Sequence, residues 1–304
     1  MKKKYFILLA FLSVFVNAQI NRFFYEYKFI PDSDNKEEVK KEMMILDIQK
    51  NGSDYYYSHD KFFTDSTSKA DIQKQISSGN GIINVKKRVN RPGQIHKVTK
   101  DYPDFKTYFF TSINADRYKI KEDKKPEWTI FPDTQKIGEY HTQKAVMSYG
   151  GRDWIAWFSS DIPFQDGPYK FCGLPGLIVK IEDTTGSHIM TLVGNKMIKN
   201  PSEEKENRIP DNVRILGLGG KDVEITKDQY KKVWKAYVND PAKEMREMRM
   251  KNGGDSNAKA PFLIFRTLDG NEISDPDKVL KEVEGRIKNW FQKNNNPMEP
   301  DLIK

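Results

Sequence analysis

Residues 151–183, GRDWIAWFSSDIPFQDGPYKFCGLPGLIVKIED, decide the fold. An aromatic segment, residues 152–158, leads into a connection rich in glycine and proline, and a second apolar segment, residues 177–181, follows at once. Within the connection Pro175 fixes φ, and Gly176 can take the positive φ of a type II turn. The stretch therefore predicts a strand, a tight turn and a second strand.

Short strands are predicted on both sides of this stretch. Residues 23–30 alternate between aromatic and charged side chains, which is typical of a half-buried strand. The Asn51-Gly52 turn between two further candidates favours an antiparallel hairpin. The remaining candidates are residues 82–89, 94–99, 106–111, 118–121, 128–131, 137–149 and 188–193, and we expect 118–121 to pair with 128–131. So many short strands predict a mainly β (α+β) fold, with one strongly curved antiparallel sheet or an incomplete barrel.

The last third of the chain predicts about three helices. The first begins at a capping box formed by Thr226 and Gln229, and Asp240-Pro241 and Asp275-Pro276 open the next two. Their apolar stripes favour core packing over a ligand-binding face. The charged segment 199–212 separates this C-terminal portion, residues 201–304, from a β-rich body, residues 19–200, and we expect the helices to pack on that body.

The first 18 residues have the pattern of a secretory signal peptide. Three lysines precede an apolar run at residues 5–16, and Val16-Asn17-Ala18 places small residues at the cleavage site. A run of about a dozen residues is shorter than the roughly 20 that span a bilayer. We expect cleavage after Ala18, export to the periplasm, the outer membrane or the outside of the cell, and no transmembrane segment in the mature chain.

Composition narrows the classes of function. The net charge of +8 is spread along the chain, and no basic stripe or nucleic-acid-binding module accompanies it, so a nucleic-acid partner is not expected. The single cysteine, Cys172, allows no intramolecular disulfide. The four histidines, His59, His96, His141 and His188, share no ligand spacing, so neither a metal site nor a cofactor is expected.

Two catalytic arrangements remain open from the residues alone. Cys172 lies in the glycine-proline connection and would become a nucleophile if His141 or His188 approached it; otherwise it is a small apolar side chain that fills a turn. A pair of carboxylates about 5 to 10 Å apart would suit glycoside hydrolysis. Nothing in the sequence gives that distance, and we expect solvated turns for the acids around the connection, which are Asp153, Asp161, Asp166, Glu182 and Asp183.

Aromatic side chains of the same region suggest binding. Trp154 and Trp157 are three residues apart, so on a regular strand they face opposite sides. One of them would be core and the other a platform for a ligand. The candidate binding residues are Arg152, Trp154, Trp157, Tyr169, Phe171 and Pro175.

The hexapeptide Gly173-Leu-Pro-Gly-Leu-Ile178, preceded by Gly167-Pro-Tyr-Lys-Phe171, resembles the signature of the GLPGLI family of exported proteins of Gram-negative bacteria. The resemblance extends upstream to KIGEY at residues 136–140 and QKA at residues 143–145. Family members often carry a cysteine before the latter element, where this chain has Thr142. The resemblance implies export and a β-rich domain, and it supplies no catalytic residue.

Three hypotheses of function follow. The first is a non-enzymatic binding or accessory protein of the cell envelope that recognises an apolar ligand, a peptide or a protein through residues 161–176. The second is a periplasmic hydrolase that uses Cys172 with a histidine, or a carboxylate pair. The third is a purely structural role in which the motif turns the chain and closes the sheet.

Overall fold

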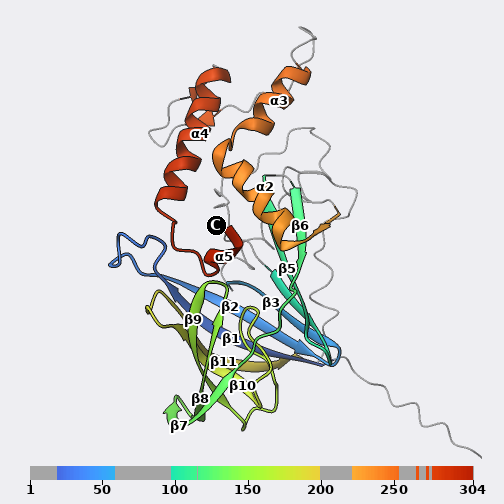
Figure 1. Cartoon of the computed structure of the whole chain (residues 1–304), viewed down its shortest axis with the longest axis vertical. Helices are drawn as coiled ribbons and strands as arrows, with labels where there is room; N and C mark the ends of the chain where they lie inside the picture. Colours follow the sequence, from blue (N-terminus) through green and yellow to red (C-terminus); the bar gives the residue numbers. More distant parts are fainter. Residues whose placement is uncertain are drawn as a thin grey trace, which may run out of the picture.

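The computed structural model describes residues 19–58, 97–114, 116–198, 221–252, 265–266, 272–273 and 276–303. Within this part of the chain, twelve strands form one open sheet in the order β12-β6-β5-β4-β3-β2-β1-β11-β10-β9-β8-β7 (Figure 1). Neighbouring strands are antiparallel except β12 and β6, which are parallel. The predicted mainly β fold, with an antiparallel sheet that does not close and helices beside it, is confirmed.

Two meanders make up eleven of the twelve strands, and β12 adds to the edge strand of the first meander. The first consists of β1 (Ile20–Phe29), β2 (Lys40–Gln49), β3 (Gly52–Ser58), β4 (Lys97–Asp101), β5 (Lys106–Ile113) and β6 (Asp116–Lys121). The second consists of β7 (Thr129–Ile137), β8 (Tyr140–Tyr149), β9 (Arg152–Ser159), β10 (Leu177–Asp183) and β11 (His188–Ile198). The pairing of β1 with β11, from Ile20 with Ile198 to Phe29 with His188, joins them. The predicted pairing of 118–121 with 128–131 is wrong, because β6 pairs with β5 and β7 pairs with β8.

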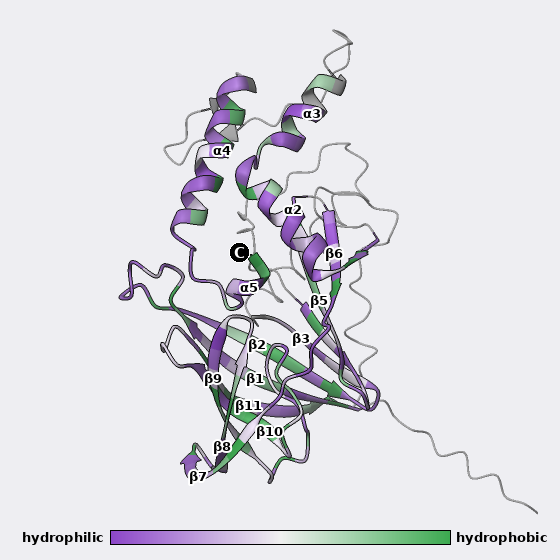
Figure 2. Cartoon of the chain, in the orientation of Figure 1, coloured by the Kyte–Doolittle hydropathy of each residue, from purple (hydrophilic) through white to green (hydrophobic). Residues whose placement is uncertain are grey.

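The C-terminal helices stand together beyond one end of the sheet (Figure 1). They are α2 (Lys227–Asn239), α3 (Lys243–Asn252), α4 (Pro276–Gln292) and the short α5 (Pro300–Ile303), with β12 (Val223–Ile225) before them and a separate ladder of β13 (Phe265–Arg266) and β14 (Glu272–Ile273). Both reciprocal bonds of the capping box at Thr226 are present. Hydrophobic residues interrupt mostly hydrophilic helices (Figure 2), and Phe291 of α4 meets the rings of Trp234 and Tyr237 on α2.

No helix in the described ranges combines the length and the apolarity needed to cross a membrane. Several predictions fall outside those ranges. They are the signal peptide with its cleavage site after Ala18, the strand at 82–89, His59, His96 and the charged segment 199–212.

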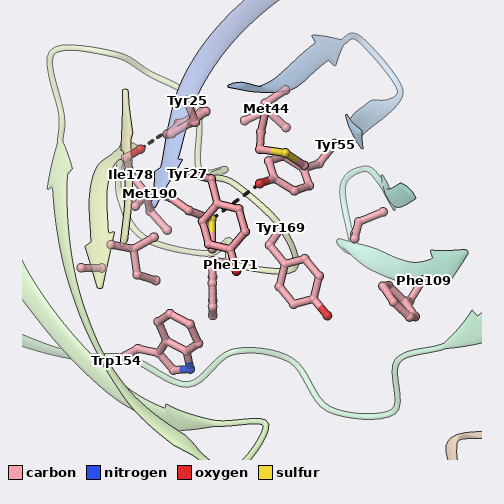
Figure 3. Packing of buried hydrophobic residues seen from close by; sticks show 14 of the residues in the cluster. Tyr25, Tyr27, Met44, Tyr55, Phe109, Trp154, Tyr169, Phe171, Ile178 and Met190 are labelled. Atoms are coloured by element: carbon pink, nitrogen blue, oxygen red, sulfur yellow. Dashed lines mark hydrogen bonds between the residues drawn. The ribbon is translucent and has the colours of Figure 1, made fainter. Parts of the chain in front are cut away.

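The core lies against one face of the sheet, which we call the inner face. Tyr25, Tyr55 and Trp154 are at most 1% exposed, although they come from β1, β3 and β9. Figure 3 shows these rings gathered around Tyr169 and Phe171, which come from the connection between β9 and β10. Full burial of each such side chain contributes about 1.5 to 3 kcal/mol. Residues 160–176, which we call the plug, thus fill part of the inner face.

Candidate functional site

The plug bridges the two meanders through its aromatic rings. Tyr169 makes edge contacts with Tyr55 and Phe109 of the first meander, at centroid distances of 6.4 and 6.1 Å. Phe171 packs against Trp154 of the second meander at 4.7 Å. The hydroxyl of Tyr25 donates a 2.7 Å hydrogen bond to the carbonyl of Ile178, directly after the plug (Figure 3). These contacts fix the plug between strands that are far apart in the sheet order.

A buried ion pair anchors the plug to β4. Lys100 and Asp166 have fully buried side chains and form a salt bridge. The Lys100 ammonium also donates to the carbonyls of Gly167, at 2.8 Å, and Phe171, at 3.3 Å. The hydroxyl of Tyr102 and the N–H of Gly167 donate to the Asp166 carboxylate. Both charges are therefore compensated, as burial requires.

The glycines of the motif answer to different needs. A Cβ at Gly176 would lie 2.1 Å from the carbonyl oxygen of Ser159, so no larger residue fits there without a backbone shift. A Cβ at Gly173 would meet nothing within 4 Å, but its φ of +92° is unfavourable for other residues. Of these two residues, only Gly176 must be glycine because two chain segments approach each other closely.

A second buried ionic cluster links the plug to the C-terminal segment. Lys170 lies 2.5 Å from both Glu122 and Glu299, and all three side chains are at most 4% exposed. Glu122 also pairs with Lys227 of α2, and Tyr169 donates to Glu299. Burial by itself would raise the pKa of Glu122, but Lys170 and Lys227 hold it below its usual value. The cluster thus connects the plug, the sheet edge and the helices.

Residues 294–303, which we call the strap, cross from α4 to the inner face. Asn296 donates from its backbone to Pro31, at 3.0 Å, and from its side chain to Ile30, at 2.8 Å. Arg152 donates to the Pro297 carbonyl at 2.7 Å and to Asp183 at 2.9 Å. The strap is therefore fastened to both meanders by specific polar bonds.

A cavity of about 160 Å³ remains between the sheet, the plug, the helices and the strap. Its lining is largely aromatic and includes Tyr27, Phe29, Phe109, Tyr169, Tyr230, Trp234 and Trp290, with Leu302 and Ile303 of the strap. Polar groups come from Glu42, Thr111, His188, Asn294, Asn296 and Glu299. It is a concave, mostly apolar site with few polar groups, the usual composition of a small-molecule site.

His188 is the most unusual of these polar groups. Its side chain is buried, with the residue 1% exposed, and its Nδ1 lies 2.7 Å from the hydroxyl of Tyr27. Its Nε2 is buried beside the strap, where backbone groups of Asn296 and Pro297 interact with the ring without forming a well-aligned hydrogen bond to Nε2. Burial, and then the Arg152 guanidinium, lowers the pKa of His188 to about 3. The imidazole is therefore neutral at ordinary pH.

The predicted catalytic residues lie in different environments. Cys172 is 2% exposed within the plug, and burial raises the pKa of its thiol to about 11. His141 is exposed on β8, whereas His188 is buried at the start of β11 and bonded to Tyr27. The thiolate needed for nucleophilic attack is disfavoured at Cys172. In the described ranges no group of three or more His, Cys, Asp or Glu side chains could hold a metal ion.

The predicted carboxylates divide into two kinds. Asp153 and Asp161 are exposed, and Glu182 is half-buried beside Lys180. Asp166 and Asp183 are buried and paired with Lys100 and Arg152. The expectation of solvated turn acids is therefore wrong for the last two, because a buried cation faces each of them.

The predicted binding residues have different surroundings. Tyr169 lines the cavity, whereas Trp154 and Phe171 are core. Trp157 is half-buried, so the two tryptophans differ in burial as their spacing predicts. Arg152 fastens the strap and lines an adjoining polar groove, and Pro175 is exposed beside His141 in another pocket. These residues do not form one surface, and their role in binding stays a prediction.

Sequence reasoning missed the groups that hold the site together. Lys100, Lys170, Glu122 and Glu299 gave no motif, and Tyr27 was interpreted only as a strand residue. One signal for the second ionic cluster was present in the sequence. Lys170 lies between Tyr169 and Phe171, so a lysine had to lie near the core if both aromatic rings were buried. Its partners are 48 and 129 residues away, and only the fold reveals them.

Comparison with known proteins leaves the activity open. Residues 151–180 match a family described as "Protein of unknown function (Porph_ging)". No curated protein sequence matches the chain. Two solved structures, described as PNGF-II in a P21 and in a C2 space group, resemble it with a TM-score of 0.45 and 17% identity. They cover 71% of this chain, which spans only 33% and 32% of their lengths.

Proposed function

We propose that this chain is an exported, non-enzymatic binding protein of the bacterial cell envelope, of the GLPGLI type, which holds a small apolar ligand. The cavity between the sheet and the C-terminal helices carries the proposal. It is lined by rings from β1, β5, α2 and α4 together with Tyr169 of the plug. Ligand sites are concave and mostly apolar in this way.

The size of the cavity limits the ligand. Its volume of about 160 Å³ is close to that of an engineered apolar cavity of about 150 Å³ that binds benzene. A single ring or a short aliphatic chain therefore fits, whereas a peptide or a fused ring system requires the strap or the helices to move. Among the ligands named by the first hypothesis, the geometry favours the small apolar molecule.

The proposal that the protein is not an enzyme rests on the protonation of Cys172 and on the ion pairs of the buried carboxylates. Burial raises the pKa of Cys172 to about 11, so the thiol stays protonated at neutral pH. Asp166 and Asp183 are occupied by Lys100 and Arg152. A hydrolase built on these groups would have to break buried ion pairs before it could act.

Placement in the envelope rests on the sequence. The pattern of residues 1–18 supports export with cleavage after Ala18, and the hexapeptide 173–178 supports assignment to the GLPGLI type. The mature chain would then act in the periplasm, at the outer membrane or outside the cell.

Titration with toluene, followed by the methyl NMR signals of Leu302 and Ile303, tests the proposal. We expect saturable shifts of both signals in the native protein. Thr111→Leu adds volume to the lining and should weaken binding, whereas Val193→Leu, at a residue that is 54% exposed, is the matched control and should not. The absence of saturable shifts up to the solubility limit of toluene would contradict the proposed cavity function.

A further inference from the structure

Acidic side chains give the aromatic cavity a preference for positive charge, and this inference rests on the proposed function. Among the described residues that line the cavity, the charged ones are Glu42 and Glu299, and none is a lysine or an arginine. His188 also lines the cavity, and burial and then Arg152 lower its pKa to about 3, so the imidazole is neutral at ordinary pH. The charged groups of the described lining are therefore all carboxylates.

The pairing of β2 with β1 places Glu42 on the inner face. Glu42 lies directly opposite Tyr27 in this antiparallel ladder, and residues paired in this way project from the same face of the sheet. Tyr27 is buried, and its pKa is raised well above the usual value, first by burial and then by the charge of Glu42. The negative charge of Glu42 therefore acts on a ring in the wall of the cavity.

Neighbouring lysines form ion pairs outside the lining. Lys170 lies 2.5 Å from Glu299 in the buried cluster that connects the plug with the helices. Lys40, two residues before Glu42 on the same face of β2, pairs with Glu38 at 3.0 Å. Neither lysine lines the cavity. A positive charge inside the cavity would therefore meet carboxylates and aromatic rings.

The rings of the cavity already stabilise one ammonium group from outside. The Lys170 ammonium lies 4.5 Å from the ring centroid of Phe109 and 5.2 Å from that of Tyr169, and both rings belong to the lining. A cation within about 6 Å of a ring centroid is attracted by the negative face of the ring. Tryptophan attracts cations most strongly, and the lining contains Trp234 from α2 and Trp290 from α4. The lining is thus suited to a second cation.

We infer that the cavity takes a small organic cation whose positive charge is surrounded by methyl or methylene groups, as in an alkylated ammonium. The methyl groups fill the apolar lining as a neutral ligand would, while the rings and Glu42 attract the charge. A trimethylammonium group has about the bulk of a single ring, so it suits the cavity of about 160 Å³. An anion of the same size is repelled by the same carboxylates.

Choline and 3,3-dimethylbutan-1-ol form a matched pair of probes, because the neutral alcohol has a carbon atom where choline has its charged nitrogen. Their dissociation constants are measured by NMR titration of the native protein, through the methyl signals of Leu302 and Ile303 in the lining. We expect choline to bind more tightly on the order of tenfold, because the rings and the carboxylate attract only the cation.

The outcomes for the native protein separate the two proposals. If choline binds no more tightly than the neutral alcohol, the cation inference is overturned, while saturable binding of the alcohol still supports the cavity function. If neither of these probes nor toluene binds, both proposals fall.

Glu42→Gln removes the charge and nearly keeps the shape of the side chain. We expect it to weaken choline about fivefold to tenfold and the neutral alcohol by less than about twofold. Glu26→Gln is the matched control, because it removes the same charge from β1 at a residue that pairs with Lys28 and does not line the cavity. It should change neither affinity by more than about twofold. Equal weakening of both probes by Glu42→Gln would overturn the inference.

A variant of the rings covers the case in which Glu42→Gln does not fold. Trp290→Leu keeps an apolar side chain and removes the ring, so it should weaken choline on the order of fivefold and the neutral alcohol by less than about twofold. Trp157→Leu makes the same change at a half-buried tryptophan that does not line the cavity, and it should affect neither probe. If Trp290→Leu weakens the two probes equally, the rings do not select a cation and the inference is overturned.

Discussion

The inner face of the sheet is closed in two different ways. At the plug, the chain fills the space with its own rings, and the charges of Lys100 and Asp166 are satisfied by the ion pair and by neighbouring donors and acceptors. Under the C-terminal helices and the strap, a cavity of about 160 Å³ remains. One sheet therefore supports a region that is filled by its own side chains and a region that leaves a cavity, which is where the proposed ligand would bind.

The largest effect that would separate the two regions is expected at Gly176. Gly176→Ala forces a Cβ to within 2.1 Å of the Ser159 carbonyl oxygen, so we expect a loss of at least 4 to 5 kcal/mol, roughly the upper limit for single substitutions, or failure to fold. Urea unfolding followed by circular dichroism measures it. Gly173→Ala is the matched control, with an expected loss of about 1 to 2 kcal/mol from backbone strain alone. Equal losses at the two glycines would show that the close approach does not matter.

The ion pair of the plug should come next. Asp166→Ala leaves Lys100 buried and unpaired, and we expect it to lower the free energy of unfolding by about 3 to 5 kcal/mol. Glu182→Ala removes the partner of Lys180, whose pair is about one quarter exposed, and should change it by about 0 to 1 kcal/mol. Adding Lys100→Met to Asp166→Ala should recover part of the loss. A double variant as unstable as Asp166→Ala would argue against the buried charge as the cause.

Acidification tests the cavity region. His188 has a folded pKa of about 3 against 6.5 for an ordinary histidine, so below pH 6.5 the unfolded chain binds a proton that the folded protein does not. The free energy of unfolding should therefore fall by about 2 kcal/mol between pH 6.5 and about pH 5 from this residue alone. His188→Phe should lack that part of the pH dependence. Identical pH profiles for the two proteins would show that His188 does not titrate as proposed.

The smallest effect is expected at the strap. Arg152→Lys keeps a positive charge near Asp183 but loses the fork that reaches Pro297 and Asn296. We expect a loss of about 1 to 2 kcal/mol, with faster hydrogen exchange at the Asp301 and Leu302 amides. The amides of Gly173 and Ile178 in the plug region should keep their protection. Faster exchange in both regions would mean that strap and plug open as one unit.

Patterns among neighbouring residues predicted the strands, but they could not predict which distant residues pair with each other. The alternation in β1 and the capping box at Thr226 each depend on neighbours in sequence, and the structure shows both. The type II turn expected at Gly176 is wrong, because its φ of +157° is too extended for that turn and the Leu177 N–H donates to Ile162. Lys100 and Asp166 are 66 residues apart, and Tyr27 and His188 are 161 apart. No periodicity connects such positions, because the order of strands in the sheet brings them together.

The strap was unpredictable for a different reason. Its attachments are made by asparagine side chains, backbone groups and Arg152, not by an apolar stripe. The asparagines at 294–296 look like an ordinary polar turn in the sequence. The residue types therefore gave no sign that this segment closes a cavity.

The junction of β1 with β11 has a consequence for how the chain reaches this state. Strands that are consecutive in the chain pair within each meander, but β1 finds its second partner only after β11 has been made and brought back across the intervening chain. Closing so long a loop carries an entropic penalty before any contact rewards it, which slows folding. Until then both strands present unpaired edges that can join other chains. We therefore expect the pairing of β1 with β11 to be the slow step of folding. The unpaired edges of these two strands should determine how strongly the folding chain aggregates and how much it depends on chaperones.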